Sequence, residues 1–449
     1  MFLMDNLHFD GSHLGSVQRT IPIAEGRYLL ERCIYLRSHT TDAWFGPWRW
    51  PTYPLHSNPR AKKRGSRPGL RYGRPVHSGS QTGRTTVKKI LLLLLATVAV
   101  FVSCTKEPLN DGVYQELAEA DRVVFEPSEV PYPALSTYRF FKGRLANLRP
   151  TRTVLPFAPL TPLFTDYAEK QRFVWMPEGV KAQYDGADKV MQFPEGSVLI
   201  KNFYYDGVQP GNVRRIIETR ILFKREGVWE FANYVWNAEQ TEAYLDLNGS
   251  VTPVTWTDAQ GTTRSIQYRI PSLAECRICH SIGDEFTPIG PKPQNLNGNY
   301  AFSAGVRNQL QQWAAHGFLE QGYPKRILST VAWNDVSKPL ALRARSYLDA
   351  NCAHCHADDH ECAYRAIRLN FNTDGGASNL GICMEPEDPF DPSLVYNVAP
   401  NNIVRSMVRF RMNTNDEATR MPQLGRTVVH TEGVALIEQW IQSLTQTCN

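Results

Sequence analysis

The chain has 449 residues, with 49 Lys and Arg against 44 Asp and Glu and a formal net charge of +5. The basic excess is concentrated at the N-terminus, because residues 1–104 contain 15 Lys and Arg but only 5 Asp and Glu. The other 345 residues carry 34 basic and 39 acidic side chains, a net charge of −5. The basic balance therefore gives no support for nucleic-acid binding, and we expect no nucleic-acid partner.

Residues 1–86 are expected to be a leader without a folded core, because they are rich in Ser, Gly, Pro and Trp and show no sustained hydrophobic period. Residues 87–104 have the features of a lipoprotein-type signal peptide: Lys88 and Lys89, then a thirteen-residue, largely apolar run, then Ser103 and Cys104. The run is short for a membrane span. A short membrane anchor behind a basic cytoplasmic tail is the alternative.

A signal peptide acts at the start of a chain, so we expect translation to begin at or near Val87. Cys104 is the predicted lipidation site. The mature protein is then exported across the cytoplasmic membrane and held on it by a lipid anchor, facing the periplasm or the cell surface.

Residues 105–130 are a predicted linker, and residues 131–270 a β-rich domain. Six segments of the latter are short, rich in β-branched or aromatic residues and bounded by turn residues. They are 197–205, 213–224, 227–236, 241–247, 251–257 and 264–270. This pattern favours an antiparallel sandwich or barrel. Its Tyr and Trp side chains either pack the core or form a face for a carbohydrate or a partner protein.

The pattern Cys-x-x-Cys-His occurs twice, as Cys276, Cys279 and His280 and as Cys352, Cys355 and His356; we call these the first and second pentads. This spacing is typical of c-type haem attachment, in which each thiol adds across a haem vinyl group and the His ligates the iron. The sequence therefore predicts two covalently attached haem c groups. A structural zinc site with four ligands drawn from the two Cys pairs is one alternative. A thioredoxin-like pair is another, but it requires a βαβ context.

Residues 271–335 are the predicted first haem region. Ser272 and Glu275 form a capping-box pattern that starts a helix at Leu273, and residues 303–318 read as a second, amphipathic helix. The distal iron ligand is unassigned here: His316 is a weak candidate, and Met176 and Met191 are weaker ones. An open iron is the alternative, and it would permit peroxidase-like chemistry.

Residues 336–449 are the predicted second haem domain. One helix is expected after a Ser337 cap, with Pro339 in its first turn, and another after a Thr431 cap. The two are expected to cross around a haem, as in class I cytochromes c. Met421 precedes Pro422 in the loop before the last helix, so it is the predicted distal ligand. The alternatives are Met412, Met407 and Met384.

The cysteines outside the pentads include a candidate disulfide between Cys362 and Cys383, which would close the loop after the second pentad in an oxidising compartment. Cys448 would then remain unpaired. Sequence alone does not decide this pairing.

Several landmarks in residues 130–446 together resemble a family of bacterial di-haem c-type cytochromes, most of whose members are described as hypothetical proteins. The landmarks are Tyr234–Asn237, Tyr268–Pro271, Ala350–His356, Leu380–Cys383 and Met421–Arg426. The resemblance implies haem at both pentads, with His280 and His356 as iron ligands. It implies little about a substrate.

These observations predict an α+β protein in which a β-rich domain precedes two mostly α-helical, cytochrome c-like haem domains. The expected function is electron transfer between redox partner proteins in the periplasm or at the membrane. A haem enzyme working at an open first haem is an alternative, as is a β-domain binding module for a carbohydrate or partner with a haem relay.

Overall fold

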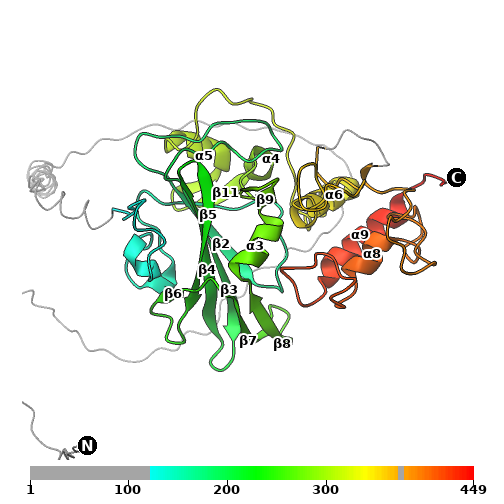
Figure 1. Ribbon diagram of the computed structural model, residues 1–449, viewed down its shortest axis with the longest axis horizontal. Helices are drawn as coiled ribbons and strands as arrows, with labels where there is room; N and C mark the ends of the chain where they lie inside the picture. The colour runs from blue at the N-terminus through cyan, green and yellow to red at the C-terminus, as the bar shows by residue number, and fades with distance from the viewer. Residues whose placement is uncertain (1–121, 373–378, 449) are drawn as a thin grey trace, which may run out of the picture. The chain divides into compact units, whose positions relative to one another are not determined.

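The computed structural model describes residues 122–372 and 379–448, and its central element is an eight-stranded antiparallel sheet (Figure 1). Six strands lie in the order β1-β2-β3-β4-β5-β6, while β7 pairs with both β3 and β8. The strands are β1 Leu155–Phe157, β2 Glu169–Trp175, β3 Val198–Val208, β4 Val213–Arg225, β5 Val228–Trp236, β6 Ala243–Leu245, β7 Ser250–Thr257 and β8 Thr263–Ile270.

The strands from β3 to β8 occupy the six segments in which the sequence predicts strands, with shifts at their ends. β4 and β5 show how the local sequence specifies the pairing. Arg225 is paired with Val228, and the two residues between them, Glu226 and Gly227, both have positive φ values of 53° and 83°. A two-residue turn of this kind matches the twist of an antiparallel hairpin and favours Gly at its second position.

Both faces of the sheet are covered, because alternate residues of each strand pack into different clusters. Val198 and Ile200 of β3 belong to a cluster with the segment from Val123 to Val154. This segment contains the short 3₁₀ helices η1 (Leu135–Tyr138) and η2 (Leu145–Asn147). On the opposite face, Leu199 packs with residues of the chain after β8, including Cys276.

The segment after β8 is mixed rather than helical. It contains helices α3 Leu273–Cys279, α4 Pro293–Leu296 and α5 Gln309–Ala315, and two strand pairs, β9 Ser281–Ile282 with β10 Glu285–Phe286 and β11 Asn299–Phe302 with β12 Gly305–Asn308. The helix expected over residues 303–318 is therefore wrong in its first half, where β12 lies. Asn308 caps the shorter α5 by accepting a hydrogen bond from the Gln311 N–H.

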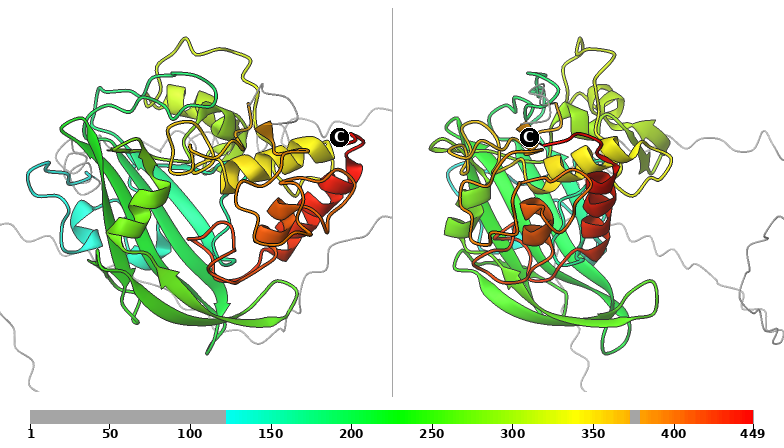
Figure 2. Two further views of the ribbon diagram at one scale, coloured as in Figure 1. Left: turned by 45° about the vertical axis from the view of Figure 1, so that its right-hand side comes forward. Right: turned by 90° about the vertical axis from the view of Figure 1, so that its right-hand side faces the viewer.

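The last part of the chain contains α6 Leu340–Asn351, α8 Met407–Met412 and α9 Thr431–Ser443, which lie beside the sheet (Figure 2). α6 and α9 are two predicted helices, and their apolar side chains share one cluster. Their caps differ from the prediction. Pro339 and His430 occupy the N-cap positions, and Ser337 instead hydrogen-bonds to Asp335.

The predicted fold class is wrong. Helices account for 18% of the described residues and strands for 26%, which does not fit two mostly α-helical haem domains. The physical reason is that residues 271–335 cover one face of the sheet and share its core instead of forming a core of their own. The three regions expected at 131–270, 271–335 and 336–449 all lie within one compact unit, Ala99–Asn449.

The predicted leader, signal peptide and lipidation site at Cys104, and most of the predicted linker, lie outside the described residues. Within the described part of the chain, no helix has both the length and the apolar character needed to cross a membrane.

Candidate functional site

A single cavity is lined by residues of both pentads, although these are distant in sequence. The first pentad contributes Cys276, Cys279 and His280, and the second contributes Cys352 together with His354 from within its spacer. The sheet contributes side chains of β2, β3 and β4, and the segment before α9 contributes the Met421 loop. Of the seven residues predicted to attach or ligate the haems, five line this cavity, and Cys355 and His356 do not.

The first pentad lies on α3, and the predicted capping box starts this helix. The Ser272 side chain accepts a hydrogen bond from the Glu275 N–H, and Glu275 accepts one from the Ser272 N–H. α3 ends at Cys279, and His280 is its C-cap residue. One short helix therefore carries both thiols and directs the imidazole from its end.

His280 has the arrangement of a metal-ligating histidine. Its Nδ1 lies 2.9 Å from the carbonyl oxygen of Thr287, and because a carbonyl only accepts, Nδ1 carries the hydrogen and Nε2 keeps its lone pair. Phe231 of β5 contacts the ring edge-on, with centroids 5.0 Å apart. Burial lowers the pKa of His280 to about 3, so the imidazole is neutral at physiological pH.

The second pentad forms a tight turn directly after α6. The N–H groups of Cys355 and His356 both donate to the carbonyl of Cys352, at 3.1 and 2.9 Å. Burial lowers the pKa of His356 to about 4, so this imidazole is neutral as well. Its Nδ1 is buried and has no hydrogen-bond partner among the described residues, and neither Cys355 nor His356 lines the cavity.

The two pentads meet at Cys279, His354 and Cys355, whose candidate ligand atoms all lie within 4.8 Å of one another. A hydrogen bond with Cys355 and the nearby His354 lower the pKa of the Cys279 thiol. Cys276 and Cys352 are not part of this cluster. The zinc alternative therefore finds one Cys from each pair plus a His, rather than four ligands from the two Cys pairs.

The Met421 loop reaches the cavity and is held by a buried guanidinium. Arg426, 4% exposed, donates to the carbonyls of Met421, Arg411 and Thr414 at 2.9–3.2 Å. Met412, at the end of α8, lines the same cavity, so two thioethers are available there.

The other methionines considered as ligands lie elsewhere. They pack in apolar clusters or are buried outside the cavity lining: Met176, Met191, Met384 and Met407. His316, the weak candidate for the first haem, is exposed at the end of α5, where its Nδ1 contacts Gln312. The structure does not bring it to the cavity.

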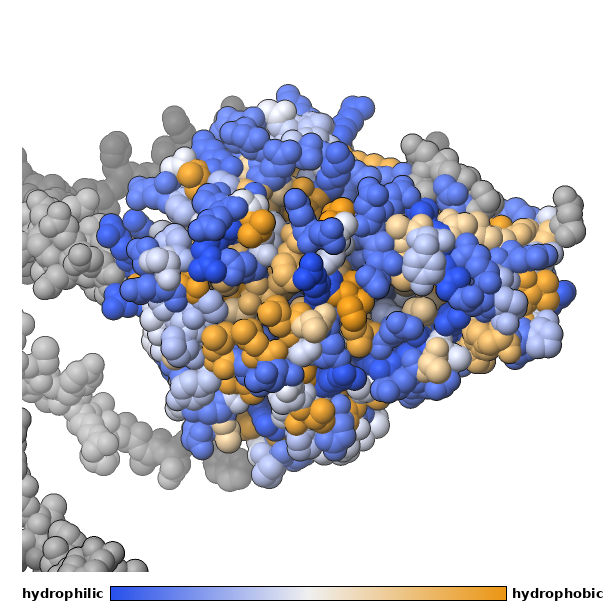
Figure 3. Space-filling view, viewed as in Figure 1, coloured by the Kyte–Doolittle hydropathy of each residue, from blue (hydrophilic) through white to orange (hydrophobic). Residues whose placement is uncertain are grey.

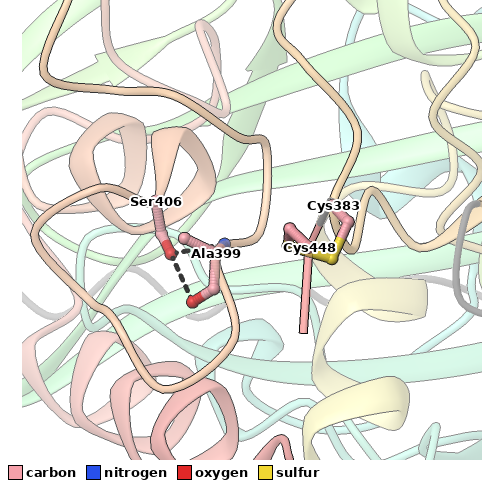
Figure 4. The surroundings of a disulfide bond; sticks show 4 residues. All are labelled: Cys383, Ala399, Ser406 and Cys448. Atoms are coloured by element: carbon pink, nitrogen blue, oxygen red, sulfur yellow. Dashed lines mark hydrogen bonds between the residues drawn. A yellow bond between two sulfur atoms is a disulfide. The ribbon is translucent and has the colours of Figure 1, made fainter. Parts of the chain in front are cut away.

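The predicted disulfide is wrong. Cys383 is bonded to Cys448, as Figure 4 shows, and Cys362 is a free thiol. The segment after α9 returns beside the turn that carries Cys383, near the Ser406 hydroxyl that accepts from the Ala399 N–H. The prediction chose Cys362 for Cys383 because the two are close in sequence. The packing of α9 instead brings Cys448 to Cys383.

His430 is a cavity residue that sequence reasoning missed. Its ring stacks on Phe164 with centroids 4.2 Å apart, and its Nδ1 lies 2.9 Å from the Tyr347 hydroxyl. Burial lowers its pKa to about 4. A single His before a helix carries no motif, so no sequence signal could have identified it.

The chain was also compared with known proteins. No family model, no curated protein and no solved structure matches it, so the resemblance to di-haem cytochromes rests on the sequence landmarks alone.

Proposed function

We propose that the chain is an exported, lipid-anchored di-haem c-type cytochrome that passes electrons between redox partner proteins. The observation that carries the proposal is the meeting of the two pentads: the first pentad and Cys352 line one cavity, and the ligand atoms of Cys279 and Cys355 lie within 4.8 Å of each other. Two motifs with unrelated roles would not be expected to lie close together in the folded chain. Haem attachment of this kind takes place outside the cytoplasm, which agrees with the signal peptide predicted to end at Cys104.

The donor set of the two pentads fits haem c. The four pentad cysteines are free thiols, both pentad histidines have depressed pKa values and are neutral, and His280 keeps Nε2 available. The unpartnered Nδ1 of His356 shows that its surroundings leave this imidazole unsatisfied. Met421 would be the sixth ligand of the second iron. Bound haem would supply a one-electron ferric–ferrous couple.

The residues around the pentads suit an electron relay. The ligand atoms of Cys279 and Cys355, one from each pentad, lie within 4.8 Å of each other, which supports transfer of electrons between two haems in one chain. Apolar side chains gather on the face shown in Figure 3, and exposed ones on α3 and β9 are Leu273, Ile278 and Ile282. An apolar surface beside the first pentad is suited to brief contact with a partner protein.

The test is a pyridine haemochrome assay with intact-mass analysis of protein produced in a host that has haem-attachment machinery. We expect two covalent haems per chain. The double variants Cys276→Ser/Cys279→Ser and Cys352→Ser/Cys355→Ser should each retain one, and the matched control Cys362→Ser should retain both. A chain without covalent haem would contradict the proposal.

A zinc site is the second candidate, because Cys279, His354 and Cys355 offer the sulfur and nitrogen ligands that zinc prefers. Three protein ligands would leave a fourth position open. Elemental analysis of the same preparation decides between the candidates. One zinc per chain that is lost in Cys355→Ser, with no haem, would establish the zinc site in place of the cytochrome.

A further inference from the structure

Three cations form a row across neighbouring strands of the sheet. Arg172 of β2 is paired in register with Lys201 of β3, and Lys201 with Arg220 of β4. All three side chains line the cavity that contains the pentads. Like charges directly opposite on adjacent strands destabilise a sheet, so this cation row needs a compensating anion.

The cation row lies in apolar surroundings. Leu199 and Leu222, in the adjoining row of the same face, belong to the buried cluster under α3. Arg172 is only 9% exposed. Burial lowers the pKa of Arg172 to about 10 and that of Lys201 well below its usual value. Lys201 is half-buried and the Arg220 side chain is 20% exposed, so water offsets only part of the cost of desolvating these charges.

Protein carboxylates neutralise one member of the row. Arg220 forms a bidentate pair with Glu218, at 2.6 and 2.9 Å, and Glu218 also accepts from the Tyr268 hydroxyl. Among the described residues, the side chains of Arg172 and Lys201 make no hydrogen bond or salt bridge, although Lys201 lies over the Phe203 ring. Two positive charges are thus left without an anionic partner.

Glu169 is the carboxylate whose charge acts most on Arg172, yet it does not complete the row. It is exposed, and its odd spacing from Arg172 places it among the β2 side chains of the opposite face. On the cavity face the charge is instead increased, because Lys170 is two residues from Arg172 and its own pKa is lowered to about 7 by burial and by Arg172.

We propose that Arg172 and Lys201, supported by Arg220, bind a carboxylate-bearing ligand in the cavity, and that in the loaded protein these carboxylates are the propionates of the haem at Cys276 and Cys279. This assignment of the source rests on the proposed function. A guanidinium fork and an ammonium are suited to carboxylates. Arg220 also acts electrostatically on the Cys276 thiol, and Lys201 and Arg220 act on His280, so the row faces the first pentad.

The experiment uses the haem-loaded full chain with Arg172→Gln and Lys201→Gln, and Arg307→Gln on exposed β12 as control. The readout is the midpoint potential of each haem by spectroelectrochemical titration. A nearby positive charge favours ferrous iron, so each test variant should shift the ferric–ferrous equilibrium of one haem about tenfold toward ferric, a fall of about 59 mV. Lys201→Arg, which keeps the charge, should restore the wild-type potential. Unchanged potentials in both test variants would overturn the propionate assignment.

Titration of the protein with succinate, monitored by isothermal calorimetry, distinguishes haem propionates from a free carboxylate ligand. If propionates fill the row, the loaded wild type binds no succinate saturably. Saturable binding that is lost in Arg172→Gln would show a free anion site and overturn the propionate assignment. If the haemochrome assay finds no haem, the proposed function is wrong, but the anion site can still be tested on the same full chain. Succinate binding then supports the anion site, and absence of succinate binding overturns it.

Discussion

Replacing Asp166 with Ala is expected to loosen the segment that leads from Met421 to α9. Asp166 is 2% exposed, and its Oδ1 accepts hydrogen bonds from the N–H groups of Thr427 and Val428 at 2.6 and 3.1 Å. Its Oδ2 accepts from the Thr427 hydroxyl at 3.0 Å. These bonds join residues 261 and 262 positions apart, so one carboxylate fixes the Met421 loop to the region before β2.

The magnitude follows from the two backbone bonds. Hydrogen bonds to a charged group contribute about 1.5–3 kcal/mol each, and Ala would leave both N–H groups without their acceptor. Water entering from the cavity would form hydrogen bonds with some of these N–H groups, so we take the lower end of this range for both bonds together. The free energy of unfolding should then fall by about 3 kcal/mol. With an unfolding entropy of about 2.1 cal/mol/K per residue, the described residues give about 0.7 kcal/mol/K, so the midpoint of thermal unfolding should fall by about 4 °C.

Differential scanning calorimetry measures the fall, and amide hydrogen exchange locates it. Exchange should accelerate at Thr427 and Val428 in Asp166→Ala. The control is Asp206→Ala, because Asp206 forms a salt bridge with Arg214 but its side chain is 57% exposed, and such pairs contribute about 0–1 kcal/mol. The reasoning is refuted if the two variants unfold at the same temperature, or if exchange at the loop does not change.

Three further predictions concern other parts of the chain. Removing the disulfide with Cys383→Ser/Cys448→Ser should lower the free energy of unfolding by about 4 kcal/mol, because the bond closes a loop with a sequence separation of 65. Peptide mapping without reduction should find the Cys383–Cys448 peptide, and a Cys362–Cys383 peptide would contradict this pairing. His430 has a folded pKa of about 4, below its unfolded value near 6.5, so its contribution to stability is complete above pH 6.5 and is lost as pH falls toward 4. In urea titrations of the haem-free chain, His430→Gln should therefore reduce the loss of stability over this range, whereas the control His316→Gln should follow the wild type. Glu218→Gln removes the charge partner of Arg220 and should lower the free energy of unfolding in urea by about 3 kcal/mol, much more than Glu226→Gln, the exposed control. If the two variants have the same urea midpoint, the ion pair makes no net contribution to stability.

Local pattern was sufficient for several elements. The six strand segments from β3 to β8 were predicted because β-branched and aromatic runs end at turn residues. The capping box of Ser272 and Glu275 placed the start of α3, and helical spacing of apolar residues placed α6 and α9. Each of these signals acts between residues that are close in sequence. The pentads themselves are also local, and they carry the proposed chemistry.

Tertiary structure decided the rest. Residues 271–335 were expected to form a helical domain, but they pack on an apolar face of the sheet and share its core. The meeting of Cys279 with Cys355, the bond between Cys383 and Cys448, and the place of His430 all depend on how distant segments return to one another. The cation row depends on strand register, since a shift of one residue would move Lys201 to the other face. Such contacts arise only when the whole chain packs, because no local preference specifies which distant surfaces are buried together.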